Sequence, residues 1–284
     1  MKYLLQLLIG FSGFFVVFAA TSNSFNFEIA RHTVTAIEGI LSKVSFAVDI
    51  PTDRIQYAKE LILGKLHNPS IELSFLVDDL FPLIKTFTHE IRVSGIYLAA
   101  EADGKFDMYI IDSKQSNELI VSLTDPSNYL GQSIFRNYAY NYRVDQYGYP
   151  LNFWQPLGAF HNETYDPRMR PWYTPVKANP IKQWSPLYLD ATSGDPCLTI
   201  VTPLFNNTDN GNKSFIGTMA LDLFLKDISE FLLHQYEGTN RIVFIIAKDS
   251  NILIGNSLSY PDYGMDSNGN KVRTVIKTAV YFVF

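Results

Sequence analysis

The sequence predicts a mixed α/β (α+β) fold, in which a long N-terminal helical stalk precedes modules built on antiparallel sheets. In three runs between residues 25 and 88, apolar residues recur every three or four positions, which is the period of a helix with one buried face. From residue 91 onwards the runs are short and rich in β-branched and aromatic residues. Asp103-Gly104 separates two of these runs, which is typical of a β-hairpin.

Residues 1–20 differ from the rest of the chain. Lys2 precedes the apolar run Leu4–Ala20, and polar residues follow it. A secretory signal has a basic start, an apolar middle of ~7–15 residues and small residues at its end, and the final pair of alanines fits such an end. A membrane-spanning helix needs ~20 apolar residues, slightly more than this run provides. We expect either a cleaved signal peptide or a retained membrane anchor, and both would send the following residues across a membrane.

Residues 21–90 are predicted to form the stalk. Its first helix should cover residues 25–48, and Asp49–Thr52 should interrupt it. Thr52 is then a plausible N-cap for a second helix over roughly residues 53–66. A third helical run is expected over about residues 71–88.

A first sheet module is predicted for residues 91–237. Its expected elements are, in order, a hairpin of Ile91–Ala99 and Phe106–Ile111, a second hairpin of Tyr140–Val144 and Tyr149–Phe153, a short helix at Trp172–Ala178, strands Cys197–Phe205 and Phe215–Asp222, and a closing helix at Leu225–Leu233. The strand, turn and strand over Arg241–Ile254 repeat the pattern of the first hairpin. We therefore expect residues 238–284 to begin a second module, which is truncated here.

Composition excludes several classes of function. A net charge of −5 argues against a nucleic-acid binder, which would carry a basic face. The sequence has no Gly-x-Ser-x-Gly, His-Glu-x-x-His, phosphate-loop or dinucleotide-binding motif, and its five histidines lack metal-ligand spacing. Cys197 lies in an apolar run and reads as a small core residue. We expect no catalytic residue, no metal site and no cofactor.

Three Asn-x-Ser/Thr sequons begin at Asn162, Asn206 and Asn212. Two of them fall in the polar run Asn206–Ser214, which we expect to be an exposed loop that could carry sugar. Short sequons also arise by chance, so each alone says little about export.

The segment Tyr165–Tyr173 concentrates the side chains best suited to recognise a ligand. It places two arginines, one tryptophan and two tyrosines within nine residues, and two prolines stiffen its backbone. An arginine holds a carboxylate through two parallel hydrogen bonds, and tryptophan and tyrosine supply apolar walls.

Acidic residues that could face this segment follow later in the chain. Tyr188 and Asp190 should share one face of a strand, and Asp222 ends an apolar strand. An arginine on one wall and carboxylates on the other suit a zwitterion. An internal Arg–Asp salt bridge among ordinary core aromatics is the alternative that spacing alone leaves open.

These residues resemble the ligand-binding module of double Cache (dCache) receptors, which have a long N-terminal helix and two stacked PAS-like modules outside the cell. An amino-acid-binding subset carries a Tyr, an Arg and a Trp-Tyr pair at the spacing seen here, then a Tyr-x-Asp and an Asp at a strand end. The seven matching positions are Tyr165, Arg170, Trp172, Tyr173, Tyr188, Asp190 and Asp222. Arg168 lies outside the pattern and reads as structural.

The resemblance covers nearly all of the chain after residue 21, and it makes residues 91–237 the membrane-distal, ligand-binding module. It implies an extracellular sensor domain of a plasma-membrane receptor, not an enzyme, that binds a free L-amino acid. Tyr165, Arg170 and Trp172 would contact the ligand carboxylate, and Asp222 and Asp190 with the tyrosines would contact its amino group. A homodimer through the stalk helix is compatible with it, as is secretion after cleavage. The alternatives are a domain that binds another small amine or carboxylate, or an accessory channel-subunit domain.

Overall fold

A computed structural model of the chain contains two compact units, and each draws on separate stretches of sequence. One unit comprises residues 1–42, 194–196 and 224–284, and the other comprises residues 43–193 and 197–223. The structure describes residues 5–11, 14–20, 27–57, 78, 80–90, 93–102, 104–112, 118–124, 139–152, 158–159, 165–191, 194–207, 213–239, 241–247, 253–256, 263–267 and 271–273.

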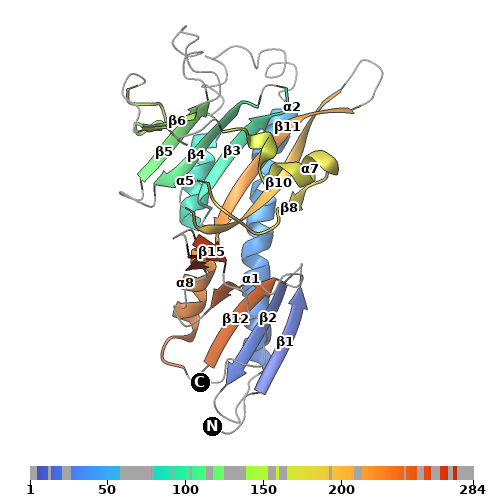
Figure 1. Cartoon of the computed structure of the whole chain (residues 1–284), viewed down its shortest axis with the longest axis vertical. Helices are drawn as coiled ribbons and strands as arrows, with labels where there is room; N and C mark the ends of the chain where they lie inside the picture. Colours follow the sequence, from blue (N-terminus) through green and yellow to red (C-terminus); the bar gives the residue numbers. More distant parts are fainter. Residues whose placement is uncertain are drawn as a thin grey trace. The chain divides into compact units, whose positions relative to one another are not determined.

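The unit that contains residues 43–193 is built on an antiparallel sheet (Figure 1). Its strands are β3 (Gly95–Ala100), β4 (Phe106–Asp112), β5 (Glu118–Thr124), β6 (Ala139–Arg143), β7 (Gly158–Ala159), β8 (Gln183–Trp184), β9 (Tyr188–Leu189), β10 (Pro196–Asn207) and β11 (Lys213–Phe224). They follow the order β7-β6-β5-β4-β3-β11-β10-β8, and β9 pairs with β10. The first and last strands, β3 and β11, are therefore neighbours in the middle of the sheet, with Asp222 opposite Gly95. This is the predicted PAS-like sheet.

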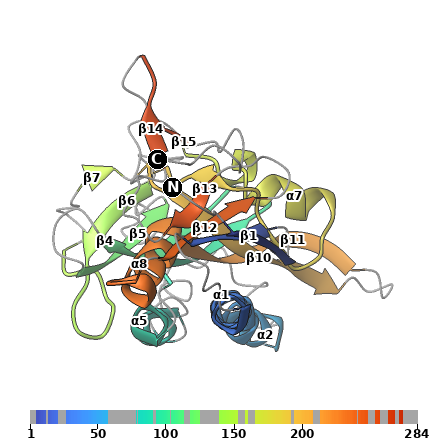
Figure 2. The same ribbon diagram turned by 90° about the horizontal axis from the view of Figure 1, so that it is seen from below.

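The longer helices of this unit pack on one face of the sheet. Figure 2 shows α2 (Asp49–Tyr57) and α5 (Phe81–Glu90) on one side of the strands and α7 (Tyr173–Ala178) on the other. The core between helices and strands is made of buried apolar side chains, and among them are Val44, Val48, Leu80, Ile84, Ile96, Tyr109, Val121 and Leu221. The opposite face is left to the segment that contains the predicted ligand-binding residues.

The helical stalk differs from the prediction in its breaks. Helix α1 (Phe27–Ala47) is separated from α2 only by Val48, and Pro51 lies within the first turn of α2, where its missing N–H is tolerated. Thr52 is not an N-cap, because its hydroxyl donates to the carbonyl of Val48 at 2.6 Å, four residues back. The predicted second helix thus begins earlier, and its expected part beyond residue 57 lies outside the described residues. Helix α5 confirms the predicted third helix from Phe81 onwards, and residues 71–77 and 79 lie outside the described residues.

The other unit contains a four-stranded sheet of order β1-β2-β12-β13, the helix α8 (Leu225–Tyr236) and the pair β14 (Tyr263–Met265) and β15 (Lys271–Arg273). Strands β12 (Arg241–Ala247) and β13 (Leu253–Asn256) confirm the predicted hairpin after residue 238.

The apolar N-terminal run forms two strands of this second sheet. They are β1 (Leu5–Phe11) and β2 (Phe14–Ala20), and β2 pairs with β12 along its whole length. Among the described residues, no helix has the length and apolar character needed to cross a membrane. The role of this run as a signal peptide or an anchor remains a prediction.

The two long strands β10 and β11 extend further than predicted. Asn206 therefore lies within β10 and Ser214 within β11, so the loop expected over Asn206–Ser214 was set too long at both ends. Asn162 and Asn212 lie outside the described residues, so all three sequons remain predictions.

Candidate functional site

The segment that begins at Tyr165 folds into a short, rigid turn. Asp166 caps the 3₁₀ helix η2 (Pro167–Met169), because its side chain accepts a hydrogen bond from the backbone N–H of Arg168 at 3.0 Å. Arg170 ends the helix in an extended conformation, and its backbone N–H donates to the carbonyl of Pro167. Helix α7 starts three residues later, where the N–H groups of Tyr173 and Thr174 donate to the carbonyl of Arg170. Both ends of the Arg170 backbone are thus fixed.

Arg168 fastens this turn to the hairpin of β3 and β4. Its Nε and Nη2 donate to the Asp166 carboxylate at 2.9 and 2.7 Å, and its Nη1 donates to the carbonyl of Glu101 at 3.1 Å. Gly104 in the hairpin turn has a φ of +74°, and a Cβ there would lie 3.1 Å from the Arg168 guanidinium. Glycine therefore meets two needs at this position, a left-handed backbone and a close approach. These contacts agree with the structural role expected for Arg168.

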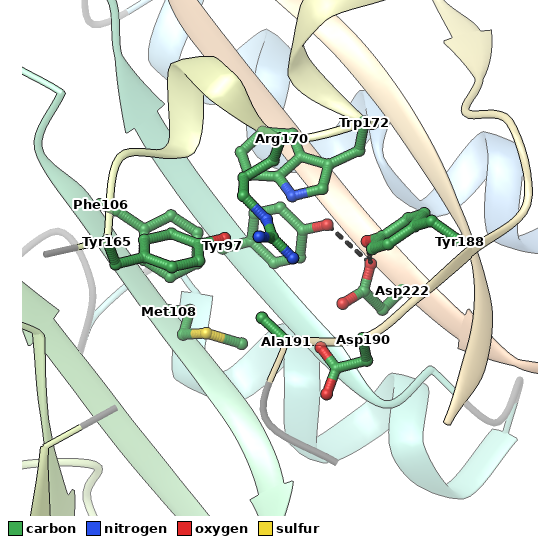
Figure 3. A pocket seen from close by; sticks show the side chains of 10 residues that line it. All are labelled: Tyr97, Phe106, Met108, Tyr165, Arg170, Trp172, Tyr188, Asp190, Ala191 and Asp222. Carbon is green, nitrogen blue, oxygen red and sulfur yellow. Dashed lines mark hydrogen bonds between the residues drawn. The ribbon is translucent and has the colours of Figure 1, made fainter. Parts of the chain in front are cut away.

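A small pocket lies on the sheet face beneath this turn (Figure 3). It encloses about 240 Å³, its opening to solvent included. The lining side chains are Tyr97, Phe106, Met108, Tyr165, Arg170, Trp172, Tyr188, Asp190, Ala191 and Asp222. Strands β3, β4, β9 and β11 and the turn at Tyr165 all contribute, so residues far apart in the sequence share one cavity.

Asp222 is buried in this pocket, with 3% of its surface exposed, and is held by hydroxyl groups. The hydroxyls of Tyr97 and Thr199 each donate to its Oδ1 at 2.6 Å, and that of Tyr188 lies 3.4 Å from the same atom. The Tyr188 and Thr199 hydroxyls lie 2.6 Å apart, which links the donors into one network. Because these bonds all end on Oδ1, the second carboxylate oxygen is left to face the pocket (Figure 3).

The environment of Asp222 works against its negative charge. Burial raises the pKa of its carboxyl group to about 7, and the nearby charge of Asp190 adds to this rise. The hydrogen bonds from Thr199, Tyr97 and Tyr188 reduce the rise. Burial, reinforced by the charge of Asp222, also raises the pKa of Tyr97 and of Tyr188, so both phenols stay protonated and can donate.

Arg170 supplies the opposite charge. Its guanidinium points into the pocket and lies over the ring of Tyr165, with Cζ 5.5 Å from the ring centroid (Figure 3). Its Nε is buried and has no hydrogen-bond partner in the described part of the chain. Among the described residues, Arg170 forms no ion pair with Asp190 or Asp222. The internal salt bridge that the sequence left open is therefore absent between these residues.

Aromatic rings pack against one another around these charges. The rings of Tyr97 and Trp172 meet edge to face at 4.9 Å, and those of Phe106 and Tyr165 lie at the same centroid distance. The walls of the pocket are thus stiffened by contacts that do not need a ligand.

Six of the seven predicted binding residues meet in this pocket. They are Tyr165, Arg170, Trp172, Tyr188, Asp190 and Asp222. Tyr173 is not among the lining residues: it is fully buried at the start of α7, and its hydroxyl donates to a carboxylate oxygen of Glu101 at 2.9 Å. Tyr173 therefore belongs, with Arg168, to the contacts that hold the turn.

Other lining residues were not predicted from the sequence. Tyr97 and Phe106 were placed in strands without a role, and Met108, Ala191 and the Asp222 partner Thr199 were not singled out. Alternation along β4 does bring Phe106 and Met108 to one face. Nothing in the sequence, however, indicated which face would be covered by the turn at Tyr165.

Cys197 is fully buried in β10, and burial raises the pKa of its thiol well above the usual value. Such a thiol is a poor nucleophile, in agreement with the core role expected for this residue. Among the described residues, no three His, Cys, Asp or Glu side chains gather in a way that could hold a metal ion.

Comparison with known proteins gives structural neighbours only. No family model matches the sequence, and no curated protein matches it. The ligand-binding domain of Mlp24 with asparagine is 18% identical, with a TM-score of 0.46 over 82% of this chain and 69% of that chain. The amino-acid chemoreceptor PctC of Pseudomonas aeruginosa, in complex with GABA, is 17% identical, with a TM-score of 0.43 over 71% of this chain and 63% of that one. The chemoreceptor CtaA of Pseudomonas fluorescens, in complex with L-alanine, is 17% identical, with a TM-score of 0.39 over 74% and 61%. Likenesses at this level do not assign a ligand to this chain.

Proposed function

We propose that this chain is the extracellular ligand-binding domain of a membrane receptor and that it binds a free L-amino acid. The observation that carries the proposal is the pair Arg170 and Asp222, which face one small pocket with opposite charge and without pairing. Buried charges are stable only when they are paired, so each of these groups has a place for a ligand group of opposite charge.

The ligand carboxylate is assigned to Arg170. A guanidinium offers two parallel N–H groups that match the two carboxylate oxygens, and its buried Nε has no described partner in the free protein. Tyr165 and Trp172 flank this position with their rings. The aromatic walls lower the local dielectric, which strengthens the ion pair.

The ligand ammonium group is assigned to Asp222 and Asp190. Only one oxygen of Asp222 accepts the hydroxyl hydrogen bonds, which leaves the other for the ligand. An ammonium group between the two carboxylates would also remove the repulsion that helps to raise the pKa of Asp222.

A zwitterion satisfies this pocket better than a simpler ion does. A plain amine would bring no carboxylate to Arg170, and a plain carboxylate would bring no ammonium group to Asp222. Compared with a zwitterion, each of those ligands would form one ion pair fewer. It would also bury a charged group of the pocket that has no ligand group to pair with.

Binding is proposed instead of catalysis because none of the described pocket residues is an activated nucleophile. Its phenols stay protonated, and the nearby thiol of Cys197 has a pKa raised by burial. The sensing role further requires two conformations that differ in affinity for the ligand. Export through residues 1–20, attachment to the plasma membrane or secretion, dimerisation through α1 and glycosylation at the three sequons are parts of the same proposal.

A thermal-shift screen of the purified chain against the twenty L-amino acids tests this function. At least one amino acid should raise the melting temperature, and the same compound as its methyl ester or as its decarboxylated amine should not. A well-folded sample that responds to none of the twenty would refute amino-acid binding.

Two variants connect such a response to the pocket. Arg170→Ala and Asp222→Ala should each abolish the shift, since each removes one end of the zwitterion site. Lys182→Ala is the matched control, because Lys182 pairs with Asp49 at 2.7 Å, away from the pocket. That variant should keep the full response.

A further inference from the structure

We infer that the amino acid bound by this pocket has a small, uncharged, apolar side chain, and that Met108, Ala191 and Phe106 form the subsite that receives it. The inference rests on the proposed function and adds the class of ligand. That class depends on which polar groups of the pocket remain available once the ligand's carboxylate and ammonium group have been placed.

The charged groups of the pocket are all used by the common part of an amino acid. Arg170 takes the carboxylate, and Asp190 and Asp222 together take the ammonium group. None of the other described lining residues carries a charge. A charged ligand side chain would therefore enter the pocket without a counter-ion, which is unfavourable in a buried site.

The neutral polar groups are occupied as well. The hydroxyls of Tyr97 and Tyr188 belong to the network around Asp222 and Thr199. The side chain of Tyr165 is hydrogen-bonded to that of Trp172. An amide or hydroxyl side chain on the ligand would have to compete with these contacts for a hydrogen bond.

The remaining wall is apolar. Met108 and Phe106 point from the same face of β4, and each has 2% of its surface exposed. Figure 3 shows Met108 and Ala191 among the side chains that border the pocket, with Arg170 entering it from the turn above. A flexible methionine and a small alanine can accommodate a short aliphatic chain.

The size of the pocket sets a limit on that chain. Eight of its ten described lining residues are buried, so their side chains leave little room between them. Much of this space is needed for the carboxylate, the α-carbon and the ammonium group. Alanine, valine and similar residues fit this description better than arginine or tryptophan.

Titration calorimetry with one series of L-amino acids tests the inference. L-Alanine, L-valine and L-leucine represent apolar side chains, L-aspartate and L-lysine the charged ones, and L-asparagine the polar ones. The best apolar ligand should bind at least about 100-fold more tightly than either charged ligand, because burying an unpaired charge is so unfavourable.

Variants of the apolar subsite then test whether Ala191 and Met108 contact the ligand side chain. Ala191→Leu should weaken binding of valine more than that of alanine, by about tenfold, because it fills the subsite. Met108→Ala should shift the preference toward the longer of two aliphatic ligands by a similar factor. Met169→Ala is the matched control, since Met169 is 77% exposed and lies outside the pocket. It should leave all affinities unchanged.

The outcomes separate the two claims. If lysine or aspartate binds as tightly as the best apolar ligand, the apolar subsite is refuted while amino-acid binding stands. Tight binding of lysine that disappears in Asp190→Asn would show that Asp190 serves a ligand side chain instead. If none of the series binds, the proposed function itself fails.

Discussion

The guanidinium of Arg170 and the carboxylate of Asp222 border one pocket, yet they do not pair with each other. Neighbouring arginines in this segment behave differently: Arg168, two residues earlier, grips Asp166 with both Nε and Nη2. One arginine thus stabilises the turn, and the other keeps its hydrogen-bonding capacity. The contrast gives the first prediction.

Replacing Arg170 with methionine should separate stability from binding. The side chain retains a similar length but loses a partly buried charge whose Nε has no described partner. We expect the free energy of unfolding of the ligand-free protein to rise by about 1 kcal/mol. Binding of the amino acid should weaken by more than about 100-fold, because a buried ion pair loses one member. Urea denaturation and calorimetry measure the two effects.

Arg168→Met is the control for this change. It removes the partly exposed contact with Asp166, so stability should fall by up to about 1 kcal/mol. If Arg170→Met also destabilises the protein, then Arg170 has a structural partner after all, and its availability to a ligand is disproved.

The buried carboxyl of Asp222 should make the ligand-free protein less stable as pH rises. Its pKa is about 7 in the folded state and about 4 in an unfolded chain, so between these values the folded state binds more protons. Stability therefore falls as pH increases from about 4 to 7, by an amount on the order of a few kcal/mol. Asp222→Asn should remove this dependence, as urea titrations at several pH values would reveal.

Ligand binding should depend on pH in the opposite direction. The ammonium group of the ligand favours ionised Asp222, so binding below pH 7 releases a proton. Affinity should increase up to about tenfold per pH unit between pH 5 and 7 and level off above pH 7. Calorimetry in buffers of different ionisation enthalpy measures the released proton directly. Equal proton release at pH 6 and pH 8 would contradict the role of Asp222.

Much of the sheet was predictable because its signals are local. The hairpin of β3 and β4 follows from an Asp-Gly turn between apolar runs, and Gly104 indeed adopts a φ of +74°. The long strands β10 and β11 follow from unbroken apolar stretches, although their ends were set too short. The two-residue strand β8 carries no periodic signal and was missed, whereas β9 lies at the strand expected from Tyr188.

The site was predictable as far as chain spacing determines it. Arg170 and Trp172 share one short turn, so their neighbourhood was correct. Tyr97 and Thr199 were missed because they reach Asp222 only through the strand order β3-β11-β10, which brings together residues more than a hundred positions apart. Tyr173 was placed in the pocket by the resemblance to known receptors, but at the start of α7 its hydroxyl donates to Glu101 instead.

The hydroxyl of Tyr97 should lower the pKa of the Asp222 carboxyl group. Its hydrogen bond to Oδ1 at 2.6 Å favours the ionised carboxylate, so Tyr97→Phe should raise the pKa of Asp222 further. The pH at which affinity levels off should move upward by about one unit or less. Tyr109→Phe is the matched control, since the Tyr109 hydroxyl donates to the carbonyl of Gly148 and not to the pocket. An unchanged midpoint in Tyr97→Phe would rule out this coupling.

Tyr173→Phe tests whether Tyr173 stabilises the turn, as the structure indicates, or contacts the ligand, as the sequence motif predicted. The Tyr173 hydroxyl donates to Glu101 and does not line the pocket, so its loss should lower stability by about 1 kcal/mol. The affinity for the amino acid should change by less than about threefold. Tyr188→Phe, which alters the network around Asp222, should weaken binding more. A large loss of affinity in Tyr173→Phe would instead support direct contact with the ligand.

One chemical change at two glycines should have opposite effects on stability. Gly148 has a φ of +98°, and a Cβ there would lie 2.5 Å from Cγ of Phe81, a core side chain. Gly148→Ala should therefore cost about 2 kcal/mol or more, because it combines backbone strain with overlap. Gly39 lies inside α1 with nothing within 4 Å of an added Cβ, so Gly39→Ala should stabilise the protein by up to about 1 kcal/mol. Urea denaturation of both variants measures the two signs. Wild-type stability in Gly148→Ala would mean that Phe81 can move away, and that this packing does not fix the turn between Asp145 and Tyr149.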